Sequence, residues 1–221
     1  MKVGSEEWTE TIRSCAATFG IAVDREQGAL FARHARELLN WNRKTNLTAI
    51  TDPAEMALKH FADSIIPVQW LPKGARVLDI GAGGGFPGIP LKIMDPSLSL
   101  TLIDAVRKKA SFLKFVIRAL RLEGIEAHHM RAEEMAGRPE FENGFDVVVC
   151  RALSALDDFA RLALPLLRTD GLMIALKGNI TDEEIEAARR SGPEGLHVEV
   201  SRYVLPVLNA ERGIIIMRRN R

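Results

Sequence analysis

One stretch of the chain decides its fold: residues 78–88, which read Leu-Asp-Ile-Gly-Ala-Gly-Gly-Gly-Phe-Pro-Gly. It completes the β-branched run 76–80, which is typical of a short buried strand, and leads into a predicted helix over 88–94. Glycines between a strand and a helix let the backbone turn sharply and let a ligand approach without meeting a Cβ atom. The stretch therefore predicts a nucleotide-type binding loop in an α/β domain.

Two registers of glycines fit this loop. Gly81-x-Gly83-x-Gly85 begins directly after the strand, whereas Gly83-x-Gly85-x-x-Gly88 matches the dinucleotide fingerprint. Asp79 favours S-adenosylmethionine, because its carboxylate suits the cationic ammonium of that cofactor and would repel a pyrophosphate. We therefore expect a methyl donor here, with an NAD(P)-dependent oxidoreductase as the weaker alternative.

After the loop, compact apolar runs alternate with helical patterns. Strands are predicted over 99–103, 124–130, 145–150 and 171–176, and helices over 107–121 and 155–168. A helix near 182–190 then precedes two strand-like runs, 198–205 and 213–217, which suggest a terminal antiparallel hairpin. The alternation predicts right-handed βαβ units in a Rossmann-like, doubly wound α/β sheet.

The chain before the loop is helical in pattern from about Glu6 to Leu71. We expect an N-terminal helical extension, 1–71, packed on a domain of residues 72–221 as one structural unit. Within the extension, the dense polar residues of 40–48 and 59–64 predict loops or caps, since such residues are poor helix-interior formers.

Particular residues of these polar stretches have competing readings. Asn46 and Thr48 are candidate caps, and His60 is expected to be a packed or hydrogen-bonded histidine rather than a catalyst. Arg43 and Lys44 are candidate RNA contacts.

Composition excludes several classes of protein. Thirty Lys and Arg against 29 Asp and Glu leave a formal charge of +1 on 221 residues, so any RNA binding must use local patches. Cys15 and Cys150 are the two cysteines and lie far apart, which excludes a disulfide framework and a familiar zinc site. We read no export signal and no membrane-spanning run, and expect a cytoplasmic protein with no metal and no membrane partner.

Ligands of this architecture sit at the carboxyl ends of the strands. Asp104 ends the second strand, roughly 20 residues after the loop, where an acid can accept hydrogen bonds from both ribose hydroxyls; a solvated strand end is the alternative. Ala132 and Glu133 follow the third strand and can flank the adenine. Arg151 ends the fourth strand and either projects into the site or forms a structural ion pair.

A strongly basic helix is expected between Ala105 and Leu122, a segment with no acid. Its six basic residues are Arg107, Lys108, Lys109, Lys114, Arg118 and Arg121. At 100° per residue, one face carries Arg107, Lys114, Arg118 and Arg121, and the opposite face carries Leu113, Val116, Ile117 and Leu120. We expect Lys114, Arg118 and Arg121 to contact RNA phosphates, and a merely solvated face is the alternative.

Several motifs point together to one family. They are Asn42-x-x-x-Asn46-Leu47-Thr48, Lys59-His60-x-x-Asp63-Ser64, the loop 79–90 with its Gly-Phe-Pro-Gly-Ile-Pro ending, Cys150-Arg151-Ala152, and Leu176-Lys177-Gly178. From about residue 30 to its end, the chain resembles the RsmG (also called GidB) family of ribosomal RNA small-subunit methyltransferases. The resemblance implies a class I S-adenosylmethionine-dependent methyltransferase fold.

The resemblance also implies an activity: methylation of N7 of a guanine in the decoding-region (530) loop of bacterial 16S rRNA. The partner would be 16S rRNA or the small ribosomal subunit, with no protein partner required. An RNA-binding ribosome-assembly factor with secondary methylation is the alternative. Because N7 already carries a lone pair, we expect catalysis by proximity and orientation, with no catalytic general base.

The resemblance finally implies cofactor contacts at Gly81, Phe86, Ala132, Glu133 and Arg151. With Asp79, Gly83, Gly85 and Asp104, these complete the expected cofactor-binding set. Lys177, in the last of the matched motifs, joins the expected RNA-binding residues.

Overall fold

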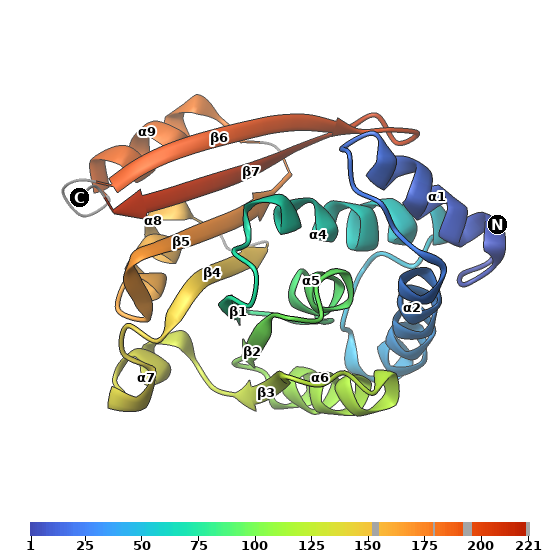
Figure 1. Ribbon diagram of the computed structural model, residues 1–221, viewed down its shortest axis with the longest axis horizontal. Helices are drawn as coiled ribbons and strands as arrows, with labels where there is room; N and C mark the ends of the chain where they lie inside the picture. The colour runs from blue at the N-terminus through green and yellow to red at the C-terminus, as the bar shows by residue number, and fades with distance from the viewer. Residues whose placement is uncertain (152–154, 179, 192–195, 220–221) are drawn as a thin grey trace.

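The computed structural model of the protein describes residues 1–151, 155–178, 180–191 and 196–219. Ala152 of the Cys150-Arg151-Ala152 motif lies outside these residues. The described strands form one sheet in the order β3-β2-β1-β4-β5-β7-β6 (Figure 1). The strands are β1 (Arg76–Ile80), β2 (Ser99–Asp104), β3 (Ile125–His129), β4 (Phe145–Arg151), β5 (Leu167–Lys177), β6 (Leu196–Leu205) and β7 (Ala210–Arg219).

The sheet is parallel from β3 to β5, and β7 runs antiparallel to both β5 and β6. The predicted terminal hairpin is therefore confirmed, with β7 inserted between β5 and β6. An all-parallel dinucleotide-binding sheet has no such inserted strand.

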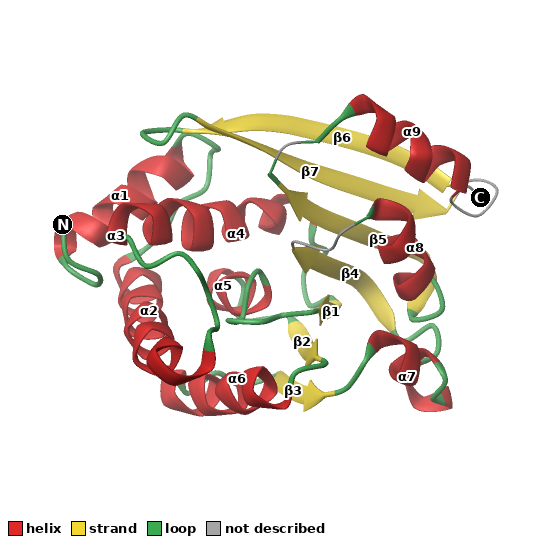
Figure 2. Cartoon of the chain, turned by 180° about the vertical axis from the view of Figure 1, so that it is seen from behind, coloured by secondary structure: helices red, strands yellow, loops and turns green. Residues whose placement is uncertain are grey.

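Helices cover both faces of the sheet (Figures 1 and 2). Side chains alternate along β4: Val147 and Val149 join the core beneath α5 (Gly88–Met94) and α6 (Arg107–Leu120), while Val148 and Cys150 join the opposite core. That second core lies beneath α7 (Ala132–Ala136), α8 (Leu156–Ala163) and α9 (Asp182–Ser191). The doubly wound prediction is confirmed.

The front of the chain is helical, as predicted. Its helices are α1 (Glu6–Ala17), α2 (Arg25–Thr45), α3 (Pro53–Glu55), the π-helix η1 (Met56–Ala62), α4 (Asp63–Ile65) and the 3-10 helix η2 (Ile66–Trp70). Trp8, Phe31 and Phe61 are fully buried in the same core as Val77 of β1. The front helices thus share the core that the sheet uses on this face.

The loop prediction for the polar stretches of this section was wrong for residues 40–45 and 59–64, whereas residues 46–48 lie outside any helix. α2 continues through residues 40–45, because Trp41 packs on Phe112 with ring centroids 5.6 Å apart, and residues 59–64 lie in η1 and α4. Asn46 is confirmed as a cap, since it ends α2 with φ +49. Thr48 caps no helix; its backbone N–H donates to Asn42 Oδ1 at 2.9 Å.

Two further boundaries differ from the prediction. The helix predicted over 155–168 ends at Ala163, and β5 begins at Leu167 rather than at 171, because Leu167 pairs with Phe145 before the ladder shifts register. The short helices α7 and η3 (Pro139–Phe141) were not predicted. In the described part of the chain, no helix is long and apolar enough to cross a membrane.

Candidate active site

The parallel strands bring most of the predicted cofactor residues to one edge of the sheet. Ile80, the last residue of β1, pairs with Ile103 of β2 and with Cys150 of β4. The glycine loop, Asp104 and Arg151 therefore start from neighbouring strand ends. Ala132 begins α7, two residues after Met130, whose N–H donates to the Asp104 carbonyl oxygen at 3.2 Å.

The glycine loop resolves the choice between the two registers. Gly81 has φ +73 and an added Cβ there would meet no atom within 4 Å, while Gly83 has φ +55 and its nearest such contact is 3.8 Å away. Gly85 is different, because a Cβ there would lie 2.5 Å from Ile89 Cδ1, and at Gly88 it would lie 2.8 Å from Asp79 Oδ2. The two registers differ only at Gly81, which is open, and at Gly88, which is crowded, and this favours the register that starts directly after the strand.

Asp104 holds the loop from the neighbouring strand. Its side chain is 5% exposed, and Oδ2 accepts a hydrogen bond from Gly83 N–H at 3.0 Å. Oδ1 accepts from Val106 N–H at 2.8 Å. Each carboxylate oxygen has a second lone pair, so the residue can still accept from ribose hydroxyls.

Asp79 lies beneath the loop and is fully buried. Its Oδ2 accepts from Gly88 N–H at 2.8 Å, whereas Oδ1 has no hydrogen-bond partner among the described residues. Burial raises the pKa of Asp79 to about 7, and the hydrogen bond from Gly88 opposes that rise. A cation placed above the loop would favour the charged carboxylate.

Phe86 is clamped between two histidines of the helical front. The His60 ring stacks on it at 4.5 Å and 10°, and the His34 ring stacks at 4.9 Å and 18°. His60 also lies 2.8 Å from Thr48 Oγ1, which confirms that it is packed and hydrogen-bonded. Burial lowers the pKa of His34 to about 4 and that of His60 to about 3, so both rings are neutral at pH 7.

His34 was missed by the sequence analysis. It is fully buried, and its Nε2 lies 2.8 Å from the Gly84 carbonyl oxygen. Its spacing from Phe31, Ala35 and Leu38 places it on the buried stripe of α2, a periodic signal that was available in the sequence. Its contact with the loop depends on tertiary packing and had no local signal.

Arg151 extends from β4 into a buried polar cluster. Its Nη1 donates to Ser64 Oγ at 3.1 Å, and its guanidinium carbon lies 5.9 Å from the centre of the Phe86 ring. Burial lowers the pKa of Arg151, and the nearby negative charge of Asp63 opposes this effect. Arg151 therefore contacts the Ser64 hydroxyl and the Phe86 ring of the loop, and its role in cofactor binding stays a prediction.

Asp63 is the acidic centre of that cluster. It is 3% exposed, accepts from the Tyr203 hydroxyl at 2.7 Å, and lies 3.6 Å from Arg212 Nε. Burial raises the pKa of Asp63, and the charge of Arg151 opposes this rise. Asp63 and Ser64 belong to one of the motifs of the family resemblance, but no role was predicted for either.

The adenine-side residues differ in exposure. Ala132 is 5% exposed, whereas Glu133 points to solvent from the first turn of α7. Their contact with an adenine remains a prediction.

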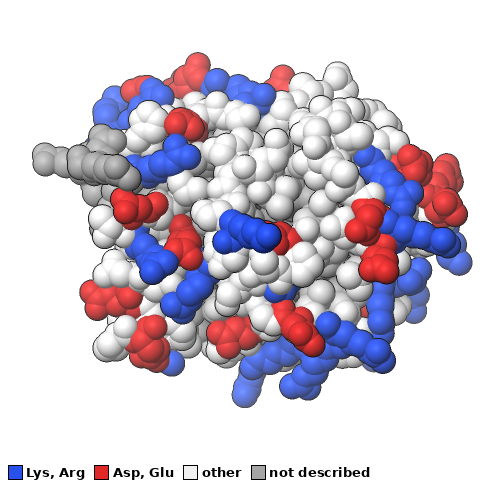
Figure 3. Space-filling view, viewed as in Figure 1, with Lys and Arg blue, Asp and Glu red and all other residues white. Residues whose placement is uncertain are grey.

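The basic helix has the predicted two-faced character. Leu113, Val116, Ile117 and Leu120 are buried on α6, while Arg107, Lys114, Arg118 and Arg121 are exposed. In Figure 3 basic side chains gather along the lower edge of the molecule, over α6. Arg43 and Lys44 are exposed at the end of α2. Lys177 was also predicted to bind RNA, but it forms an ion pair with Glu184 and its side chain is only 14% exposed. We therefore do not assign it to the RNA-binding surface.

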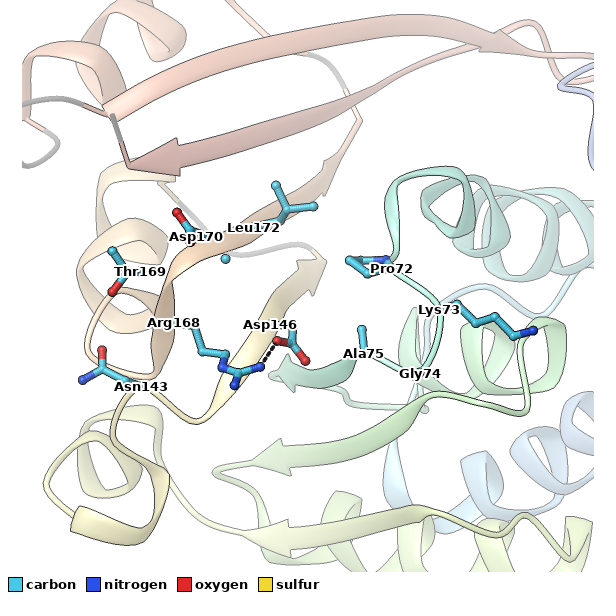
Figure 4. A pocket seen from close by; sticks show the side chains of 11 residues that line it. Pro72, Lys73, Gly74, Ala75, Asn143, Asp146, Arg168, Thr169, Asp170 and Leu172 are labelled. Carbon is cyan, nitrogen blue, oxygen red and sulfur yellow. Dashed lines mark hydrogen bonds and ion pairs between the residues drawn. The ribbon is translucent and has the colours of Figure 1, made fainter. Parts of the chain in front are cut away.

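A cavity of about 720 Å³ lies at the opposite edge of the sheet, away from the glycine loop (Figure 4). It is lined by the segments before β1 and β4 and by the start of β5, and an ion pair between Arg168 and Asp146 crosses it. Parallel strands present their amino ends at this edge, where the residues predicted for the cofactor are absent.

Comparisons with known proteins agree with this arrangement. The family model described as GidB, rRNA small subunit methyltransferase G, matches residues 27–206. A protein of Geobacter sp. strain M21 named ribosomal RNA small subunit methyltransferase G is 42% identical over 213 residues, covering 96% of this chain and 97% of its own. The protein of the same name from Geobacter metallireducens is 44% identical over 207 residues, covering 92% and 93%.

Solved structures support the fold alone, since their identities are low. A SAM-dependent methyltransferase from Aquifex aeolicus matches 81% of this chain and 97% of its own, with a TM-score of 0.57 and 17% identity. TYW2 of P. horikoshii, solved in complex with MeSAdo, matches with a TM-score of 0.56 and 16% identity; the match covers 71% of this chain and 61% of that protein.

Proposed function

Because the chain belongs to the GidB family of rRNA small subunit methyltransferases, we propose that it methylates N7 of a guanine in the decoding-region loop of 16S rRNA. S-adenosylmethionine is the methyl donor and the fold is the class I methyltransferase fold. The observation that carries the proposal is the open glycine loop at Gly81 and Gly83, held by Asp104 at the edge where the strands end.

The residues of this edge fit the donor. Gly81 and Gly83 offer backbone with no side chain in the way, and Oδ1 of Asp79 is a buried acceptor without a partner. We assign the ribose to Asp104 and the adenine to Ala132 and Glu133. Because the order of strands is β3-β2-β1-β4, the methionine end then points toward β4 and Arg151.

The bound donor supplies an electrophilic methyl group. Guanine N7 has an in-plane lone pair, so the protein has no proton to remove before attack. Its contribution is to hold the base close and in line, which can lower a barrier by roughly 7 to 11 kcal/mol in favourable cases. A general base is therefore unnecessary to this reaction.

Electrostatics constrain the surrounding side chains. Methyl transfer places positive charge on the guanine, so a cation against N7 would oppose it. His34 and His60 are neutral at pH 7 and add no such charge. Arg151 donates a hydrogen bond to Ser64 and lies over the Phe86 ring. We assign its remaining donors to cofactor or phosphate binding.

We assign the RNA backbone to exposed cations outside the loop. Lys114, Arg118 and Arg121 lie on the open face of α6, and Arg43 and Lys44 lie at the end of α2. Phosphate contacts of this kind position the substrate without reading its sequence. A cytoplasmic setting belongs to the same proposal, because Cys15 and Cys150 are buried free thiols, as a reducing compartment allows.

The test is methyl transfer from labelled S-adenosylmethionine to small-subunit particles and to protein-free rRNA, both lacking the modification. We expect label on one guanine, and the better substrate shows which assembly state is recognised. Label on another base or on no RNA, by protein that binds S-adenosylmethionine, would overturn the assignment of the target. Retained RNA binding without any label would instead support the assembly-factor alternative.

A further inference from the structure

Two aromatic rings meet at the surface where α2 crosses α6. The rings of Trp41 and Phe115 have centroids 5.3 Å apart, with 38° between their planes. Phe115 is 39% exposed, and Trp41 is partly exposed while its ring also packs on buried Phe112. The pair is therefore anchored in the core on one side and open to solvent on the other.

A hollow of about 400 Å³ lies beside Trp41 of this pair. It is lined by Glu37, Asn40, Trp41, Lys44 and Thr45, all on α2. The hollow joins an aromatic wall to side chains that can donate and accept hydrogen bonds. These are the features that a nucleobase requires, since every base has a π-face and polar edges.

Three exposed cations lie close to the aromatic pair, and Glu37 is the acidic residue of the hollow. Lys114 and Arg118 flank Phe115 on α6, Lys44 lines the hollow, and all three are exposed. α6 carries no acidic residue along its whole length, and its basic side chains are visible in Figure 3. The patch is thus complementary to a polyanion that also carries flat apolar groups.

We propose that the Trp41–Phe115 platform, meaning these two rings and the adjoining hollow, stacks an unpaired base of the RNA substrate. The inference rests on the proposed function and extends it, because it names single-stranded RNA as the form that this face recognises. Exposed aromatic rings beside cations bind single strands by stacking, which a paired duplex cannot offer from its interior. A protein partner is the competing occupant that the experiment must reject.

The test compares two RNA probes without S-adenosylmethionine: a single-stranded oligonucleotide and a duplex of the same sequence. Phe115→Ala is the main variant, because its ring is partly exposed and its removal spares the core. Phe115→Tyr restores a stacking face, and Val207→Ala is the control, since Val207 is 83% exposed and lies in the β6–β7 turn. Thermal unfolding of each variant shows that it is folded.

We expect wild type to prefer the single strand. Phe115→Ala should bind it about tenfold more weakly, which is within the range for loss of one base stack, while duplex affinity and salt dependence stay unchanged. Phe115→Tyr should recover most of the loss, and Val207→Ala should match wild type. Equal loss on both probes, or none on either, would overturn the platform; no loss on either would leave a protein partner as the occupant of this face.

These outcomes are separable from the proposed function. If wild type methylates the rRNA while Phe115→Ala binds single strands normally, the platform is wrong and the proposed function stands. If wild type transfers no methyl group while its preference for single strands depends on Phe115, the proposed function is wrong and the platform stands.

Discussion

The Nε2 atom of His34 lies 2.8 Å from the carbonyl oxygen of Gly84, fifty residues further along the chain. His34 is neutral at pH 7, so Nε2–H donates, and its Nδ1 finds no partner among the described residues. The same ring stacks on Phe86. A helix of the N-terminal section thus fixes both the backbone and a side chain of the glycine loop.

Replacing His34 by Phe keeps a ring beside Phe86 but leaves the Gly84 carbonyl without its donor. An unpaired buried acceptor costs about 1–3 kcal/mol, and part of this cost should appear as a loop that holds S-adenosylmethionine less well. We expect roughly a fivefold to hundredfold loss of affinity in a calorimetric titration. His197→Phe, a ring exchange at an exposed position of β6, is the matched control. Unchanged affinity in folded His34→Phe would show that the loop does not depend on this contact.

Asp79 should make cofactor binding depend on pH. Burial raises its pKa to about 7, so the ligand-free loop carries a protonated carboxyl below that pH and loses its attraction for a cationic ammonium. We expect affinity for S-adenosylmethionine to rise from pH 6 to pH 8, with a limiting slope of roughly tenfold per pH unit below the pKa. Asp79→Asn should bind weakly and show a flat profile over this range. A wild-type profile as flat as that of the variant would contradict the assignment.

The same group has the opposite effect on stability. Its pKa in the folded, ligand-free protein lies above the ordinary value of 3.8, so its contribution is fully present below pH 3.8 and is lost as pH rises through about 7. We therefore expect Asp79→Asn to gain stability relative to wild type between pH 6 and pH 8. Urea unfolding at these two pH values, without cofactor, measures the difference. If Asp79→Asn instead lost stability relative to wild type over this interval, the pKa of Asp79 would not be raised in the folded protein.

Arg151→Ala should reduce methylation mainly through binding. The change removes a charged donor from Ser64 and a cation from the Phe86 ring, and a charged hydrogen bond contributes about 1.5–3 kcal/mol. We expect cofactor or RNA affinity to fall roughly tenfold or more, with a smaller change in kcat at saturation. If both affinities stayed intact while turnover vanished, Arg151 would act on the reacting atoms instead.

Neutralising Lys114, Arg118 and Arg121 together should weaken RNA binding and its dependence on salt. Each phosphate contact to a single strand adds about 0.7 to the steepness of log affinity against log salt concentration. Losing three contacts should therefore make this slope shallower by about two. The matched control replaces Lys2, Arg161 and Arg190, which are exposed cations elsewhere on the chain. Fluorescence titrations at several salt concentrations measure both proteins. Equal slopes for the two triple variants would show that α6 has no special part in binding.

The local signals of the sequence were sufficient for the centre of the fold. β1 and α5 have the predicted bounds, because an apolar run, a glycine loop and a helix pattern follow one another without interruption. The two registers of the loop could not be separated in the same way. Their difference depends on what surrounds Gly81 and Gly88, and Leu102 and Asp79 crowd Gly88 only once the chain is folded.

Other features were decided by tertiary packing. Asn40 and Asn42 are poor helix formers, yet α2 runs through them because Trp41 is held against Phe112. The histidine clamp on Phe86 joins three separate segments of the chain, so spacing in the sequence carried no sign of it.

The most direct measurement of the central claim uses small-subunit rRNA in which 7-deazaguanine replaces guanine, compared with the unmodified RNA. The account predicts label transfer from S-adenosylmethionine to the natural RNA and none to the substituted RNA, because the attacking N7 atom is absent, while both RNAs bind equally. Equal labelling of the two RNAs would contradict it, since the methyl group would then be placed on an atom other than N7.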